Sequence, residues 1–132
     1  MKTQRKIFCC GCQVEVDAKL VTGAVTYPHR RDLAKLPFWK CDGCGNFVGC
    51  HHKTSDRTRP LGVIPTQALK AARQEIHRVI DPIWKSHRLG RTELYGRIAR
   101  AIGVAEYHTA EIRSVEQARE VLRVARELEV SL

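Results

Sequence analysis

Six cysteines are the residues of this sequence whose type and spacing point most directly to chemistry. Four of them form two C-x-x-C pairs, Cys9 with Cys12 and Cys41 with Cys44. Two such pairs direct four thiolates at a common centre, which is the tetrahedral arrangement that zinc prefers. We therefore predict one structural zinc ion on these cysteines. Two alternatives stay open: Cys10 replaces Cys9 as a ligand, or the four cysteines hold an iron–sulfur cluster.

The spacing and the ligand type also bear on function. Between Cys12 and Cys41 lie 28 residues, more than the roughly 15 to 20 residues usual between such pairs. We therefore expect a long insertion between the two turns. Four thiolates leave zinc no open position for water, so the site is predicted to build the fold and not to perform hydrolysis. We accordingly expect that the protein is not an enzyme.

The run Cys50-His51-His52 follows the second pair and has three interpretations. The first is a buried thiol beside two solvated histidines. The second is a further metal site that also uses Cys10. The third is contact with a phosphate or a protein partner. The cations available for that contact are Lys53, Arg57 and Arg59.

The charge of the chain narrows the class of partner. Lysine and arginine number 23 against 14 acidic residues, which gives a net charge of +9. Residues 1–60 hold 11 of the basic and 5 of the acidic side chains. This excess suits the phosphates of nucleic acid or an acidic protein surface. The residues predicted to bind nucleic acid or a partner are Arg30, Arg31, Lys35, Lys40, His51, Lys53, Arg57 and Arg59.

The sequence lacks two features, a membrane helix and a signal peptide, and this indicates where in the cell the protein is located. No apolar run approaches the roughly 20 residues that a membrane helix needs. The charged N-terminus is not followed by the apolar stretch of a signal peptide. We therefore expect a cytoplasmic protein without a membrane partner, in a reducing environment where cysteines bind metal or stay free.

Composition changes near residue 60 and predicts an α+β chain. Residues 1–60 are expected to form a zinc ribbon with a short antiparallel β-sheet, and residues 61–132 a bundle of three or four α-helices. The first strand is expected at 13–20, continuing to Tyr27 through a bend at Gly23. The other predicted parts of the ribbon are a basic loop at 28–37, strands at 38–40 and 46–48, and a basic linker at 53–65.

The helical half shows a repeat of about 3.6 residues. A first helix should follow Thr66, and at Pro82 it either kinks or gives way to a second helix. A further helix is expected from Thr92 to Gly103, and a last one after the capping residue Ser114. A plain helical hairpin or a helix-turn-helix is expected at 92–113.

Several longer motifs together resemble a known family. They are C-x-x-C, then W-K-C-x-G-C-G-x-x-V-G-C-H, then Arg-Pro-Leu-Gly, Ile-Asp-Pro-Ile-Trp and Gly-Arg-Thr-Glu-Leu-Tyr. In combination they resemble a phage and prophage family of zinc-finger-containing proteins of unknown function, from about Phe8 to about Leu122. The family has C-P-x-C-G in the first pair, where this chain has Cys10 and Gly11. The motif residues that the resemblance covers are Cys50, His51, Arg59, Asp81, Trp84, Arg91 and Tyr95.

The resemblance implies a zinc-binding protein of a phage or of the bacterial cytoplasm. We expect it to bind DNA or RNA through the basic surface of the ribbon, where aromatic residues such as Phe38 and Trp39 either stack on bases or pack around the metal. One alternative is an adaptor that docks on an acidic bacterial host protein. Another is a nuclease of the His-metal finger type that uses His51 or His52.

Overall fold

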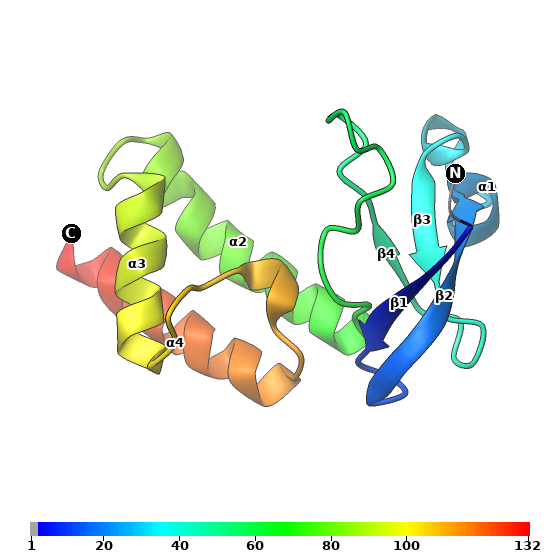
Figure 1. The fold of residues 1–132 in the computed structure, drawn as a ribbon. Helices are drawn as coiled ribbons and strands as arrows, with labels where there is room; N and C mark the ends of the chain where they lie inside the picture. The colour runs from blue at the N-terminus through cyan, green and yellow to red at the C-terminus, as the bar shows by residue number, and fades with distance from the viewer. Residues whose placement is uncertain (1–2) are drawn as a thin grey trace. The chain divides into compact units, whose positions relative to one another are not determined.

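The computed structural model describes residues 3–132, which divide into two compact units, one ending at Thr66 and one running from Gln67 to Leu132. The first unit is a sheet and the second is made of helices, so the predicted α+β fold is confirmed (Figure 1). Within residues 3–132 no helix has the length and apolar character that crossing a membrane requires. The elements in chain order are β1 (Gln4–Cys9), β2 (Val14–Thr22), α1 (Gly23–Thr26), β3 (Pro37–Lys40), β4 (Phe47–Gly49), α2 (Gln67–Lys85), α3 (Arg91–Ile102) and α4 (Val115–Ser131).

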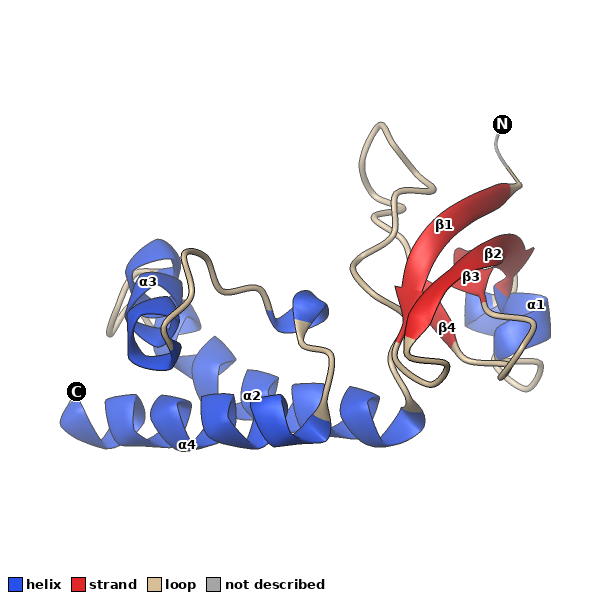
Figure 2. Ribbon diagram, turned by 60° about the horizontal axis from the view of Figure 1, so that its bottom comes forward, coloured by secondary structure: helices blue, strands red, loops and turns tan. Residues whose placement is uncertain are grey.

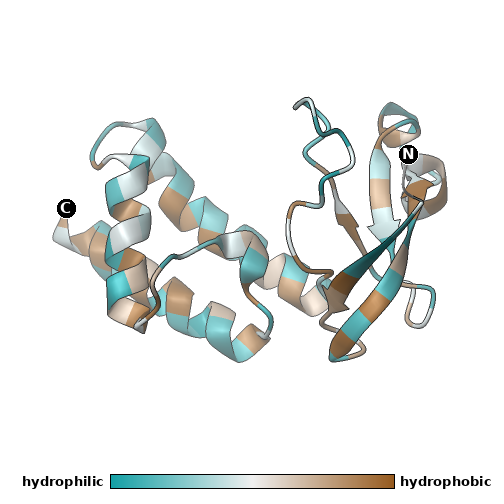
Figure 3. Cartoon of the chain, viewed as in Figure 1, coloured by the Kyte–Doolittle hydropathy of each residue, from teal (hydrophilic) through white to brown (hydrophobic). Residues whose placement is uncertain are grey.

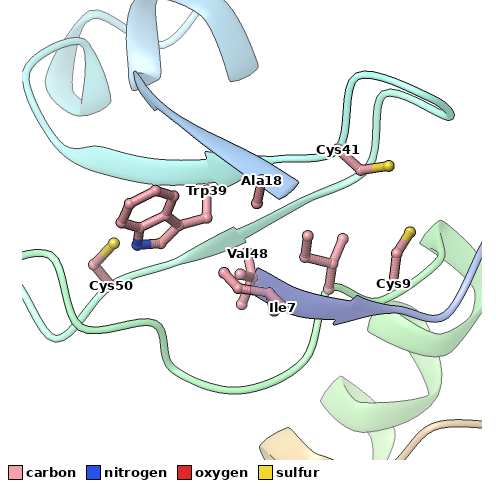
Figure 4. Close-up of a cluster of buried hydrophobic side chains, with 8 residues drawn as sticks. Ile7, Cys9, Ala18, Trp39, Cys41, Val48 and Cys50 are labelled. Atoms are coloured by element: carbon pink, nitrogen blue, oxygen red, sulfur yellow. The ribbon is translucent and has the colours of Figure 1, made fainter. Parts of the chain in front are cut away.

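The sheet of the first unit has the strand order β1-β2-β3-β4, and every neighbouring pair is antiparallel (Figure 2). Successive side chains of a strand point to opposite faces, and one face is lined by apolar side chains. We call it the inner face. Its buried cluster consists of Ile7, Cys9, Ala18, Trp39, Cys41, Val48, Cys50 and Ile64 (Figure 4).

Strand β1 was not predicted from the sequence. Its residues Gln4, Arg5 and Lys6 are exposed and polar, so only Ile7 and Cys9 carry the apolar alternation that marks a strand. All six residues of β1 pair with β2, and this pairing holds the segment in the extended conformation that its own sequence does not specify. The existence of this strand therefore depends on its partner more than on its own sequence.

The strand predicted at 13–20 corresponds to β2, and its predicted continuation to Tyr27 is wrong, because β2 ends at Thr22 and a short helix follows. The reason lies at Gly23, whose backbone N–H donates to the Leu36 carbonyl at 2.9 Å. A Cβ atom at Gly23 would lie 1.8 Å from the carbonyl oxygen of Leu33. Only glycine allows the two backbone segments to approach so closely.

The segment predicted as a linker instead belongs to the sheet unit. Leu61 donates its N–H to the Gly49 carbonyl of β4 at 2.9 Å, and Ile64 donates to the Phe8 carbonyl of β1 at 2.9 Å. Residues 59–64 thus cover both edge strands, whose backbone groups would otherwise be open to other chains. Ile64 is fully buried in the apolar cluster, which fixes this segment in place.

In the helical unit, α2 runs through Pro82 as one helix, so the alternative in which a second helix begins at this residue is wrong. Proline removes one backbone donor, but the helix resumes its pattern because Ser86 donates to the Pro82 carbonyl at 3.0 Å. Four apolar residues of this helix, spaced as the repeat of about 3.6 residues predicts, are buried. These are Leu69, Ile76, Ile80 and Ile83.

The last two helices have the ends that the sequence predicts. Gly103 closes α3 in the left-handed conformation at φ 78°, and the Ser114 hydroxyl accepts a hydrogen bond from the Gln117 N–H at 3.1 Å at the start of α4. Figure 3 shows polar and apolar residues alternating along these helices. Residues 104–113 contain only a short 3-10 turn at Thr109–Glu111, so neither the helix-turn-helix nor the plain helical hairpin expected at 92–113 is formed there.

Candidate metal centre

The four predicted ligands meet at one end of the sheet. Cys9 ends β1 and Cys41 directly follows β3, while Cys12 and Cys44 lie on the turns that come next. Their four Sγ atoms all lie within 4.8 Å of one another. In the part of the chain from residue 3 onward, no other group of three or more metal-ligating side chains is gathered in this way.

The spacing of the sulfur atoms fits zinc. The Sγ atoms of Cys9 and Cys44 are 3.4 Å apart, and those of Cys12 and Cys41 are 3.7 Å apart. In a regular tetrahedron with zinc–sulfur bonds of about 2.3 Å, neighbouring sulfurs are about 3.8 Å apart. Four thiolate donors at these separations therefore provide a closed tetrahedral set with room for one ion.

Both turns that carry the ligands have the same backbone shape. The N–H of Gln13 donates to the Cys9 carbonyl and the N–H of Gly45 donates to the Cys41 carbonyl, each at 2.8 Å. Gln13 and Gly45 both have left-handed backbone angles, with φ of 61° and 79°. The first turn therefore forms with Gln13 at the position where the second turn has Gly45, and Cys9 stands in the ligand position.

Gln13 tolerates this conformation with the help of its side chain, whose Nε2 donates to the Cys10 carbonyl at 2.5 Å. Gly11 in the same turn lies close to the second turn. A Cβ atom there would lie 2.7 Å from Nδ2 of Asn46 and 3.3 Å from Sγ of Cys44. The two turns thus face each other closely across the metal position.

The thiols differ in how readily they ionise without metal. Burial raises the pKa of Cys9 to about 12, even though backbone N–H groups of Cys12 and Gly11 point at its sulfur. Burial acts in the same direction on Cys44, but the Asn46 N–H and the neighbouring thiols donate to its sulfur and lower its pKa. A thiolate at Cys9 thus needs the positive charge of a bound cation, so zinc binding displaces a proton from this residue.

The remaining cysteines lie apart from this centre. Cys50 is buried beside Trp39 in the apolar cluster (Figure 4), and burial raises its pKa to about 11. Cys10 is also buried, and its N–H donates to the Ile64 carbonyl at 2.9 Å. His51 and His52 are half-buried, and neither joins Cys10 and Cys50 in a metal-ligating group within residues 3–132. The geometry favours the buried-thiol interpretation of Cys50.

The predicted basic residues do not form one surface, because the sheet separates them. The indole N–H of Trp39 points to the inner face and donates to the Thr58 carbonyl at 2.6 Å. The loop of residues 51–59 therefore covers the inner side of the sheet, and α1 lies on the other side (Figures 1 and 2). The predicted binding residues in this loop are His51, Lys53, Arg57 and Arg59.

The opposite face of the sheet, which we call the outer face, holds another of the predicted cations. Lys40 lies on it, directly opposite Lys19 of β2, a residue that the sequence reading missed. Asp42 in the second metal turn accepts from Lys19 at 2.8 Å and lies 3.9 Å from Lys40. This hydrogen bond raises the pKa of Lys19 and lowers that of Asp42. The other predicted cations, in the segment that follows α1, are Arg30, Arg31 and Lys35.

Three aromatic rings gather on the outer face beside these lysines. Tyr27, Phe38 and Phe47 form an edge-to-face triangle with centroid distances of 5.2 to 5.8 Å. Phe38 is buried by its neighbours, and Trp39 is buried on the inner face, so both pack instead of offering a stacking surface. Tyr27 and Phe47 are half-exposed, and the sequence analysis did not identify either as a possible binding residue.

The sequence profile of the zinc-finger-containing domain family matches residues 5–128, and the chain belongs to this family. Together with the four gathered thiolates, this identifies the centre as a site for one structural zinc ion. No curated protein and no solved structure matches the chain significantly.

Neighbouring cysteines provide a matched test of the ligand set. Cys12→Ser should abolish stoichiometric zinc binding and unfold the sheet unit, because formation of such a site and folding are coupled. Cys10→Ala should retain one zinc per chain. Elemental analysis and the dispersion of amide signals from residues 3–66 measure both effects. Zinc loss in Cys10→Ala, or its retention in Cys12→Ser, would contradict the assigned ligands.

The second metal turn offers a test of backbone strain alone. A Cβ atom at Gly45 would meet nothing within 4 Å, so a substitution there changes only the left-handed conformation. Gly45→Val should lower the free energy of unfolding of the zinc-bound protein by about 1–2 kcal/mol or more. Gly45→Asn should cost less, because asparagine tolerates this region. Chemical denaturation measures the free energy of unfolding of both variants. Equal losses in the two variants would refute the left-handed turn assigned to Gly45.

Proposed function

We propose that the protein binds single-stranded nucleic acid through the outer face of its sheet unit. The observation that carries the proposal is one row across the sheet, in which Lys19 lies opposite Lys40 and Lys40 lies opposite Phe47. Cations there would contact phosphates, and the aromatic ring would stack on an exposed base. The alternation of these strands places all three side chains on the same face.

Acidic residues also lie on this face, where Glu15 and Asp17 share the side of β2 that holds Lys19 and Lys6 pairs with Asp17, so a surplus for phosphates has to come from the segment that follows α1. Lys19 and Lys40 share the single carboxylate of Asp42. Asp32 accepts two hydrogen bonds from Arg30, at 2.9 and 2.7 Å, and so neutralises that residue. Arg31 and Lys35 are exposed, and no described residue forms an ion pair with either. The whole sheet unit has 11 basic against 5 acidic residues, a net charge of +6.

The aromatic triangle supports single-stranded nucleic acid over a duplex as the ligand. Stacking needs bases that are not already paired, and it adds affinity with little preference for sequence. The half-exposed rings of Tyr27 and Phe47 lie next to Phe38, which holds them in place from below. The arrangement thus offers both parts of a single-strand site, a cationic track and a stacking platform.

We propose a binding role without catalysis, in the cytoplasm of a bacterial cell and in a phage-related setting. Four thiolates saturate the zinc ion, so it has no open position at which to activate water. The resemblance of the motifs to phage and prophage proteins supports the setting. The histidines at 51 and 52 lie on the loop that covers the inner side, away from the proposed binding face.

Fluorescence anisotropy with a labelled single-stranded oligonucleotide tests the binding face. Lys19→Gln combined with Lys40→Gln should weaken binding and reduce the slope of log affinity against log salt by about 1.4, for two lost phosphate contacts. Asp42→Asn should act in the opposite direction and tighten binding. Phe47→Leu should weaken binding with little change in the salt slope.

The matched control is Lys53→Gln with Arg57→Gln, which removes the same charge from the inner side and should have a smaller effect. Zinc content is measured for each variant, so that loss of the fold is not mistaken for loss of contact. A larger effect of the control pair would contradict the proposed face. Absence of binding by the parent protein at low salt would reject nucleic acid and leave an acidic protein as the partner.

A further inference from the structure

An arginine held between two aromatic rings stands out in the helical unit. The guanidinium carbon of Arg91 lies 5.5 Å from the ring centre of Trp84 and 4.8 Å from that of Tyr95. Such contacts hold a cation through the negative faces of the rings. No carboxylate within residues 3–132 pairs with Arg91, whose side chain is exposed. The aromatic contacts thus fix the guanidinium group and leave its N–H groups available to a ligand.

The rings that hold Arg91 are themselves fixed by hydrogen bonds and packing. The indole N–H of Trp84 donates to Asp81 Oδ1 at 3.1 Å. Tyr95 packs against Tyr107 with ring centres 5.4 Å apart. The buried Tyr107 hydroxyl is hydrogen-bonded to Thr109 at 2.8 Å. A network of this kind holds a side chain in one geometry before a ligand arrives.

A pocket of about 330 Å³ lies next to this arginine, between α3 and the segment that precedes α4. Arg91 and Thr92 line it together with Tyr95 and Tyr107, and Ala99 lies on its wall. This volume is at the lower end of the roughly 300–1,000 Å³ typical of small-ligand sites. The pocket therefore accepts one small ligand and not a protein segment.

Gly96 on the wall of this pocket is not explained by folding. It lies in the interior of α3, where glycine destabilises a helix relative to alanine. Its φ is not left-handed, and a Cβ atom there would meet only the Arg100 guanidinium at 3.8 Å, an ordinary contact. What the missing side chain does provide is space in the pocket.

We propose that this pocket binds one nucleotide, with its phosphate on Arg91 and Thr92 and its base against Tyr95, Tyr107 and the small residues of α3. Guanidinium groups form paired hydrogen bonds with phosphate oxygens. Flat bases pack favourably against aromatic side chains. The nucleotide is either free or the 5′-phosphorylated end of a single strand, because both present the same groups.

The charges around the pocket support an anion over a cation. The Glu106 carboxylate on the rim lies 3.3 Å from Nε2 of His108, which offsets the charge of that carboxylate when the imidazole is protonated. A cationic ligand would meet the Arg91 guanidinium, which has no compensating carboxylate within the described chain. The inference concerns the helical unit alone and does not rest on the proposed role of the sheet.

Titration of the full-length zinc-bound protein with adenosine 5′-monophosphate, followed by amide NMR shifts, tests the inference. Shifts are expected at residues 91–99 and 105–108. Inorganic phosphate alone and adenosine alone should bind more weakly, because each supplies half of the contacts. Arg91→Gln should weaken binding about tenfold or more, as expected for loss of hydrogen bonds to a charged group. The matched control Arg88→Gln, at an exposed arginine outside the pocket, should have no effect.

Gly96→Leu should fill the pocket and abolish binding while the helix stays folded, and Gly96→Ala should weaken it less. Lys19→Gln with Lys40→Gln should leave nucleotide binding unchanged, which separates this inference from the proposal for the sheet. A strand with and without a 5′-phosphate distinguishes a strand end from a free nucleotide. Undiminished binding in a folded Gly96→Leu protein would overturn the inference. Tighter binding of phosphotyrosine than of the nucleotide, or equal binding of inorganic phosphate, would also overturn it.

Discussion

Four thiolates must come within a few ångströms of one another, and the rest of the sheet unit depends on how this is achieved. The ligands lie on two turns that 28 residues separate in the sequence. Without metal, burial raises the pKa of Cys9 to about 12, so this thiol does not become a thiolate on its own. Zinc removes this obstacle and links the β1–β2 hairpin to the β3–β4 hairpin, which together contribute only a small apolar cluster.

The zinc turns also connect to the surfaces on either side of the sheet. Ile64 bonds to the backbone on both sides of Cys9, accepting from Cys10 and donating to Phe8, so the segment that closes the sheet is fixed next to the metal. Asp42 lies between two ligands in the second turn and carries the ion pair with Lys19. The position of the metal therefore sets the position of the cations proposed to bind phosphate.

The features that the sequence predicts well are those with a local signal. The paired cysteines identify the ligands through spacing alone, and the repeat in α2 identifies Ile76 and Ile80 as buried. Strand β1 and residues 59–64 were missed because their place depends on pairing with distant strands. For the same reason the sequence analysis predicted that Lys40 and Arg57 belong to one binding surface. In the structure Lys40 lies on the outer face of the sheet, whereas Arg57 lies on the loop that covers the inner side.

X-ray absorption at the zinc edge of the purified full-length protein tests the central claim most directly, because it reports the atoms bound to the metal. The account predicts one zinc per chain surrounded by four sulfur atoms at about 2.3 Å. The same spectrum is expected for Cys10→Ala. A nitrogen or oxygen neighbour at about 2.0–2.1 Å, as a histidine or water ligand would give, would contradict the closed four-cysteine centre.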